Sequence, residues 1–121
     1  MNERLVTIPL PAVYPGSGAA LATYAYITTC VDMTIIHISA APDVDDTGLT
    51  LAIEDDAASC ITAFACDDAD VPGEFSSTAV GGTSDPVFVA AGSVLSFIAA
   101  NAANATQIVG TITALVGEVF A

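Results

Sequence analysis

One acidic segment has the residue spacing of a calcium-binding loop. From Asp43 to Glu54 the sequence reads DVDDTGLTLAIE, with early oxygen-bearing side chains, a glycine at the sixth position and a carboxylate at the twelfth. Calcium binds about six to eight oxygen ligands around a sharp turn, which this layout could supply. However, Thr47 replaces the usual Asp or Asn, and a strand over residues 49–53 would put about 20 Å of extended chain between the turn and Glu54. We therefore predict a solvated hairpin turn and no metal ligands.

Three pairs of adjacent aspartates are candidates for acid–base catalysis. Such chemistry needs two carboxyl groups that converge in a cleft and have separated pKa values. Neighbouring residues in loops or at strand ends normally point apart into solvent. The sequence therefore predicts no catalytic residue and a protein that is not an enzyme. The pairs are Asp45–Asp46, Asp55–Asp56 and Asp67–Asp68.

The single histidine and the three cysteines match no metal-binding or nucleophile pattern. His37 lies in an apolar run, and we expect it to be a packed or hydrogen-bonded core residue. Cys30, Cys60 and Cys66 lack the spacing of a zinc site. We expect buried free thiols, because unpaired cysteine packs as a small apolar side chain; a Cys60–Cys66 disulfide is the alternative in an oxidising medium. No cofactor is predicted.

The charge composition argues against two classes of partner. The 121 residues include fourteen Asp and Glu but one basic residue, Arg4, and the formal net charge is −13. Nucleic acids and anionic membranes both attract Lys and Arg, so neither is an expected partner. Apolar residues make up 54% of the chain and charged residues 12%. This balance indicates a folded domain whose surplus apolar surface meets another subunit.

Neither a secretion signal nor a membrane helix is expected. The first residues lack the basic and apolar regions of a signal peptide. Residues 86–117 are uncharged, but Asn101, Asn104 and Gln107 divide them into pieces shorter than the roughly 20 apolar residues of a membrane helix. Gly81 and Gly82 lack the following helix and lysine of a phosphate-binding loop.

Alternating apolar and polar residues predict short β-strands along most of the chain. Leu49, Leu51 and Ile53 alternate with Thr and Ala, as in a strand with one buried face. Residues 32–39 have apolar residues on both faces: Met33 and Ile35, with His37, lie on one face, and Ile36 and Ile38, with Thr34, lie on the other. This strand is therefore expected to be buried on both sides. The other expected strands are Leu5–Leu10, Thr23–Thr28, Ile61–Cys66, Pro86–Val89, Val94–Ala99 and Gln107–Val116.

Gly-, Pro- and Asp-rich turns separate these segments and indicate an all-β fold. Seven to eight short strands at this spacing predict a single antiparallel β-sandwich or jelly roll over residues 16–121. Residues 1–15 contain three prolines and are expected to form an extended N-terminal arm. A helix over residues 108–120 is the alternative for the last segment, but Gly110, Gly117 and many β-branched residues favour a strand.

Two C-terminal segments carry a resemblance to a known class of proteins. Residues 85–97 read DPVFVAAGSVLSF, and residues 111–118 read TITALVGE. In both the chain resembles small β-sandwich proteins of tailed-phage virions, the head-decoration or cement proteins. The resemblance implies a homotrimeric structural protein on the surface of the virion head, which clamps the major capsid protein or other virion subunits from outside. It also implies that the N-terminal segment reaches a neighbouring subunit.

Two other functions stay open at this point. A ligand-binding or adhesion sandwich, dependent on carbohydrate or calcium, is the main alternative, although the chain has no tryptophan for a sugar platform. A small hydrolase is the third.

Overall fold

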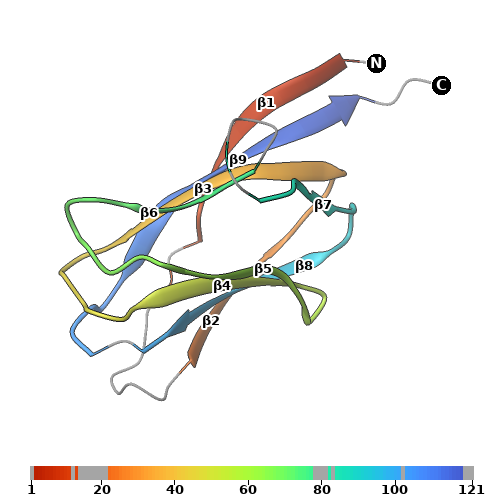
Figure 1. The fold of residues 1–121 in the computed structure, drawn as a ribbon. Coiled ribbons are helices and arrows are strands. Elements are labelled where there is room, and N and C mark those ends of the chain that lie inside the picture. Colours follow the sequence, from red (N-terminus) through yellow and green to blue (C-terminus); the bar gives the residue numbers. More distant parts are fainter. Residues whose placement is uncertain are drawn as a thin grey trace.

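The described part of the chain folds into nine β-strands that form two packed antiparallel sheets (Figure 1). The computed structural model describes residues 2–11, 13, 22–77, 82, 84–101 and 103–118, and these contain no helix. The predicted all-β antiparallel sandwich is thereby confirmed. The strands are β1 (Asn2–Pro9), β2 (Ala22–Thr28), β3 (Met33–Pro42), β4 (Thr50–Asp55), β5 (Ala58–Ala65), β6 (Gly73–Ser76), β7 (Val87–Val89), β8 (Val94–Ala100) and β9 (Ile108–Glu118).

Every segment expected as a strand contains one, but the structure has one strand more than the seven to eight predicted. The additional strand, β6, reads GEFS and has a single apolar residue, so apolar alternation could not reveal it. The helix considered for the last segment is not formed, because Ile108–Glu118 is the strand β9. In the described ranges, no helix is long and apolar enough to cross a membrane.

The order of the strands sends the chain repeatedly from one sheet to the other. The first sheet has the order β1-β9-β3-β6, with β7 also paired to β3, and the second has the order β2-β8-β4-β5. The acidic turn therefore links β3 of one sheet to β4 of the other. Our expectation of a hairpin at this turn was wrong, because β3 and β4 are not neighbours in a sheet.

One apolar core fills the space between the sheets. It takes side chains from β3 and β9 on one side and from β4, β5 and β8 on the other. Burying a large aliphatic or aromatic side chain contributes roughly 1.5–3 kcal/mol. The largest fully buried side chains of this core are Phe97, Ile35, Ile38, Leu49, Leu51, Ile53, Ile61, Leu95, Ile108 and Ile112.

A β-bulge in β3 explains why His37 is not in this core. The register between β3 and β9 shifts between Ile35 and His37. A bulge inserts one residue and so reverses the faces of the residues that follow. As a result Ile35 and Ile38 both face the core, whereas the side chain of His37 is 27% exposed. Strict alternation had placed His37 on the same face as Met33.

The first strand is an edge strand along its whole length. β1 pairs with β9 at eight successive positions, whereas β3 pairs with β9 only as far as Leu115. Beyond that residue, β1 and β9 project from the sandwich as a two-stranded ribbon (Figure 1). Leu10 and Val13 continue the contact with β9 through backbone hydrogen bonds. The described part of residues 1–15, where we expected an extended arm, is thus paired with the sandwich.

Candidate functional site

The acidic turn between β3 and β4 holds the loop between β8 and β9. Asp46 is only 1% exposed, and its Oδ2 atom accepts hydrogen bonds from three consecutive backbone N–H groups. The donors are Ala103, Asn104 and Ala105, at distances of 2.9, 3.0 and 2.8 Å. One buried carboxylate thus satisfies three N–H groups that have no strand to pair with.

Asp43 extends this contact to the start of β9. Its Oδ1 atom accepts hydrogen bonds from the backbone N–H groups of Thr106 and Gln107, and its Oδ2 atom accepts one from the Thr106 hydroxyl. We had expected these aspartates to be solvated. That expectation was wrong for Asp46, which is buried against the loop.

These hydrogen bonds favour the ionised form of both carboxylates, so both are charged at neutral pH. For Asp43, the Thr106 hydroxyl and then the Thr106 N–H group lower the pKa below its ordinary value of 3.8. For Asp46, burial opposes ionisation, but the three backbone N–H groups outweigh it and the pKa is again lowered. The other oxygen of Asp46, Oδ1, is buried without a hydrogen-bond partner among the described residues, which makes its charge more costly.

We expect the stability of the protein to fall in acid because of these two groups. A pKa that is lower in the folded state than in the unfolded state stabilises the fold above the unfolded value. That stabilisation is lost as the pH falls below about 4 and through the folded pKa. Urea unfolding of the parent and of Asp43→Asn, from about pH 7 to pH 2, tests this. The difference in stability between the two should shrink toward zero in acid, and a constant difference would rule out a contribution from Asp43 ionisation.

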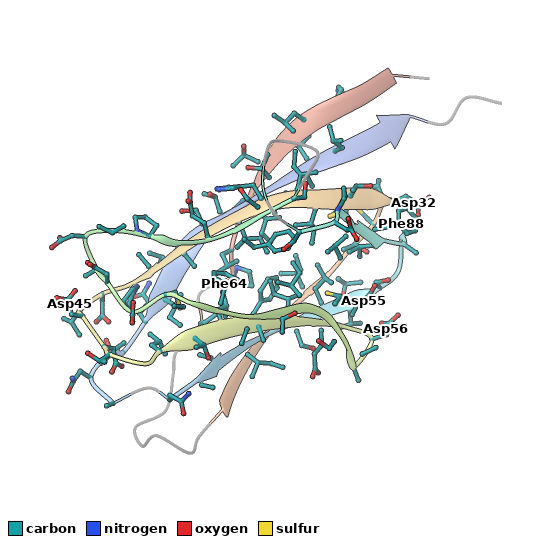
Figure 2. The ribbon with its side chains drawn as sticks, in the orientation of Figure 1. Asp32, Asp45, Asp55, Asp56, Phe64 and Phe88 are labelled. Carbon is teal, nitrogen blue, oxygen red and sulfur yellow. The ribbon has the colours of Figure 1, made fainter. Side chains whose placement is uncertain are left out.

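The structure does not gather the residues of the calcium-loop pattern. Asp45 and Asp55 lie at opposite ends of the sandwich (Figure 2), and Glu54 is the neighbour of Asp55 on β4. The early and late positions of the pattern are therefore separated by the length of a strand. Across the described ranges, no three His, Cys, Asp or Glu side chains are grouped so that they could hold a metal ion.

The three aspartate pairs hold loops through hydrogen bonds to the backbone. In each pair at least one carboxylate accepts a backbone hydrogen bond. Asp45 accepts a hydrogen bond from Ala69 N–H at 2.8 Å, and Asp56 accepts one from Val94 N–H at 2.9 Å. Asp68 accepts hydrogen bonds from the N–H groups of Asp70 and Val71. Asp56 also has a φ of 50° in the tight turn between β4 and β5, a conformation that aspartate tolerates.

The three cysteines are not bonded to one another, and the histidine is hydrogen-bonded to a glutamate. All three cysteines are free thiols; Cys66 is buried, Cys60 is half-buried and Cys30 is exposed, contrary to our expectation for Cys30. Burial and then a nearby aspartate raise the pKa of Cys60 to about 11 and that of Cys66 to about 12, so both stay protonated near neutral pH. His37 Nε2 lies 3.1 Å from Glu74 Oε1, hydrogen-bonded as expected but outside the core.

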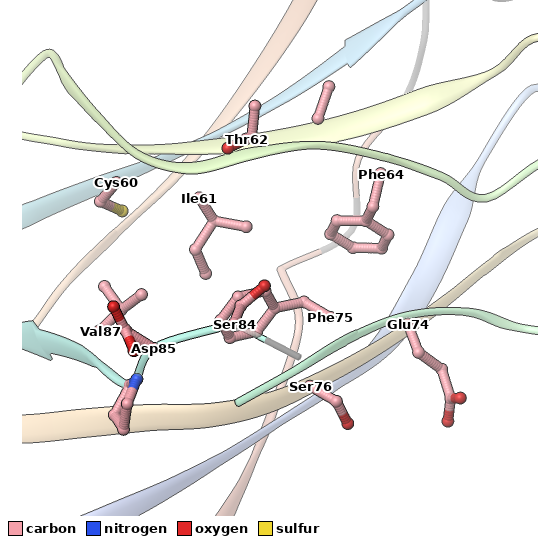
Figure 3. A pocket seen from close by; sticks show the side chains of 12 residues that line it. Cys60, Ile61, Thr62, Phe64, Glu74, Phe75, Ser76, Ser84, Asp85 and Val87 are labelled. Atoms are coloured by element: carbon pink, nitrogen blue, oxygen red, sulfur yellow. The ribbon is translucent and has the colours of Figure 1, made fainter. Parts of the chain in front are cut away.

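A cleft of 610 Å³ opens between the two sheets at one side of the sandwich. β5 forms one wall, and β6 with the segment that leads into β7 forms the other. Ile61 and Phe64 extend from β5 toward Phe75 and Val87 of the opposite sheet (Figure 3). Sequence reasoning missed this cleft, because β6 was not predicted and the two walls are distant in sequence.

Glycine closes one end of this cleft. A Cβ atom on Gly73 would lie 1.8 Å from the carbonyl oxygen of Ala65, so only glycine lets the first residue of β6 approach the end of β5 this closely. Gly82 donates its N–H to the carbonyl oxygen of Ser77 at 2.7 Å, so this N–H group is already hydrogen-bonded within the chain. Gly81 lies outside the described residues.

The arrangement offers apolar contact and backbone hydrogen bonding. The aspartates that a sequence search would select hold loops. In the cleft, the edge of β5 that no described strand covers lies next to aromatic side chains. A comparison with known protein families, with curated proteins and with solved structures finds no match to this chain.

Proposed function

We propose that this chain is a structural protein of a virus particle, of the decoration or cement type that binds the head from outside. Its partners in this role are the major capsid protein or other virion subunits. The observation that carries the proposal is the pairing order of the strands.

That order is the order of a long two-stranded ribbon folded across itself. β6 and β7 both pair with β3 and so occupy one position in the ribbon. With that position counted once, the first strand pairs with the last, the second with the second last, and so on inward. The pairs are β1 with β9, β2 with β8, β3 with β6 and β7, and β4 with β5. Such pairing supports a jelly roll, the double Greek key that viral capsid and lectin domains share.

An exposed apolar row on the outer face of the first sheet supports attachment to another protein. Leu5 pairs with Leu115, Leu115 with Thr34, and Thr34 with Phe88, so the row crosses four strands. Leu5 is 61% exposed and Phe88 is 62% exposed. The row contains no charge although the whole chain has a net charge of −13. Exposed apolar side chains such as Leu5 and Phe88, connected here through Leu115 and Thr34, are typical of protein contacts.

The proposed oligomer is a homotrimer held by the second sheet. Tyr24 and Tyr26 of β2 stand opposite Ile98 and Ser96 of β8 in the register, and we assign the contact between subunits to this region. The projecting ribbon of β1 and β9 is the proposed anchor, in place of a detached arm. An extended edge strand can add to the sheet of a neighbour through backbone hydrogen bonds.

Binding to particles that lack the chain tests the proposal. The purified protein should co-sediment with them in a fixed ratio and raise the temperature at which they open. The double variant Leu5→Gln, Phe88→Gln should bind at least tenfold more weakly, because it makes the apolar row polar. Val71→Gln is the matched control, since Val71 is 64% exposed but lies in a loop away from the row.

Two results would contradict this proposal. One is the absence of binding to particles by the folded parent protein. The other is an equal loss of binding in the row variant and in Val71→Gln, which would place the attachment elsewhere. A lectin-like module remains the second candidate, because lectin domains share the same strand order; saturable binding to an immobilised glycan would favour it.

A further inference from the structure

We propose that copies of this chain associate through the side of the sandwich that carries the edge strands β1 and β2. The inference rests on the proposed function only for the number of copies in the oligomer. Three features of the described residues carry it: the placement of the charges along the strand order, their distance from the two edges, and the two edges themselves.

The charges of the chain are concentrated in one half of the sandwich. Twelve of the fourteen acidic residues lie between Asp32 and Asp85. Strands β2 and β8 contain no charged residue. The charges of β1 and β9 are Glu3, Arg4 and Glu118, which lie at the tip of the projecting ribbon. Since β1 is next to β9 and β2 is next to β8, these four strands form an uncharged side, opposite the side where β5 and β6 flank the cleft.

The distances between charges favour a second copy as the partner of this side. Neighbouring strands lie about 4.8 Å apart, so β3 and β4, each the third strand of its sheet, lie about 10 Å behind the edges. Charges beside these two strands are then about 25 Å from those of an adjoining copy. The Debye length is about 8 Å at physiological salt, so the repulsion is largely screened. Contact through the opposite side would instead bring together the acidic loops at Asp67–Asp70, which join β5 to β6.

Acidic groups approach the uncharged side at the ends of its strands. Asp56 accepts a hydrogen bond from Val94 N–H at the start of β8, and Asp46 accepts hydrogen bonds from the loop that follows β8. The contact between copies is therefore assigned to the middle of the strands.

The middle of both edge strands suits pairing with another chain. No described strand pairs with the outer edge of β1 or of β2. β2 has no charge and no proline, and its register with β8 is continuous. The charges and the proline of β1 lie at its two ends and leave Leu5–Ile8 free of both. Charges, prolines and bulges are what commonly keep edge strands from pairing. A closed ring of copies joins two different surfaces, so we assign the contact to β1 of one copy and β2 of the next.

Sedimentation equilibrium of the full-length protein, without particles, tests the inference. Salt screens the repulsion between chains of net charge −13. Association should therefore be at least about tenfold tighter in about 0.5 M NaCl than in about 0.02 M NaCl. An association held by opposite charges would weaken over the same range.

Variants that place a charge on the two edges locate the contact. Thr7→Asp in β1 and Tyr24→Asp in the middle of β2 should each weaken association at least about tenfold, because each puts like charges at the contact. Thr62→Asp is the matched control for Thr7→Asp, since both threonines are exposed on edge strands and Thr62 belongs to β5, on the opposite side. It should change association by less than about twofold. Circular dichroism shows which variants are folded.

Three results would overturn the inference. The first is a folded parent protein that stays monomeric at both salt concentrations, and the second is tighter association at low salt. The third is an equal effect of Thr7→Asp and Thr62→Asp, a comparison that holds even if Tyr24→Asp does not fold. Because no particle is present, a failure of self-association is distinguishable from a failure to bind particles.

Discussion

Asp46→Ala is expected to lower the free energy of unfolding by about 3 kcal/mol, the largest loss for any single charged residue of the chain. The substitution removes the acceptor of three backbone N–H groups, those of Ala103, Asn104 and Ala105. The Ala105 donor is buried and costs about 1 kcal/mol or more when it is left without a partner, and the two part-buried hydrogen bonds of Ala103 and Asn104 to the charged carboxylate contribute about 1 kcal/mol each. The loop between β8 and β9 should loosen first, and urea titration followed by circular dichroism measures the total effect.

Asp45→Ala is the matched control, because it removes the same charge from the same turn. Asp45 is exposed and accepts one hydrogen bond, from Ala69 N–H. Its loss should cost less than about 1 kcal/mol. Equal losses in the two variants would show that the charge of the turn matters and the buried acceptor does not. Asp46→Asn should fall between them, since the amide retains one neutral acceptor oxygen.

Phe97→Ala is expected to cost about 4 kcal/mol, because Phe97 is the largest fully buried side chain of the core. It lies in the middle of β8, where alanine would leave a cavity between the sheets. Phe88→Ala removes the same atoms from a side chain that is 62% exposed, and should change stability by no more than about 0.5 kcal/mol. Guanidinium unfolding of both variants checks the pair.

The variants Phe97→Ala and Phe88→Ala also distinguish an effect on stability from an effect on binding to particles. Phe88 belongs to the apolar row on the outer face of the first sheet, so Phe88→Ala should weaken attachment to particles while leaving the fold intact. A large loss of stability in Phe88→Ala, or a small one in Phe97→Ala, would contradict the assignment of the core to the inner faces of the two sheets.

The strands could be predicted from the sequence because their signals are local. Alternation at Leu49, Leu51 and Ile53 reports directly which face is buried, and all three residues are fully buried in the structure. The β-branched residues and glycines of the last segment likewise predicted β9 correctly. What alternation could not reveal is the bulge at Ile35–His37, since one inserted residue leaves no mark in composition and yet reverses a face.

The features of the candidate site depend on contacts between distant segments. Asp46 and Ala105 are 59 residues apart, and nothing near either residue indicates the other. An aspartate in a turn commonly bonds to its own local backbone, so solvation was the ordinary expectation. The cleft forms because β5 and β6 lie in different sheets. That placement follows from the topology of the whole fold and cannot be read from the sequence of either strand. The order of the strands in the sheets, on which the jelly-roll argument rests, likewise could not be predicted from the sequence.

Electron cryo-microscopy of virus particles from the source of this chain tests the central claim most directly. The account predicts density at regular positions on the outside of the head that fits the nine-stranded sandwich, in a fixed ratio to the capsid subunits. It also predicts that the outer face of the first sheet, with Leu5 and Phe88, or the projecting ribbon of β1 and β9 contacts the shell. Particles that lack this density, although the chain is produced in the same infected cells, would contradict it.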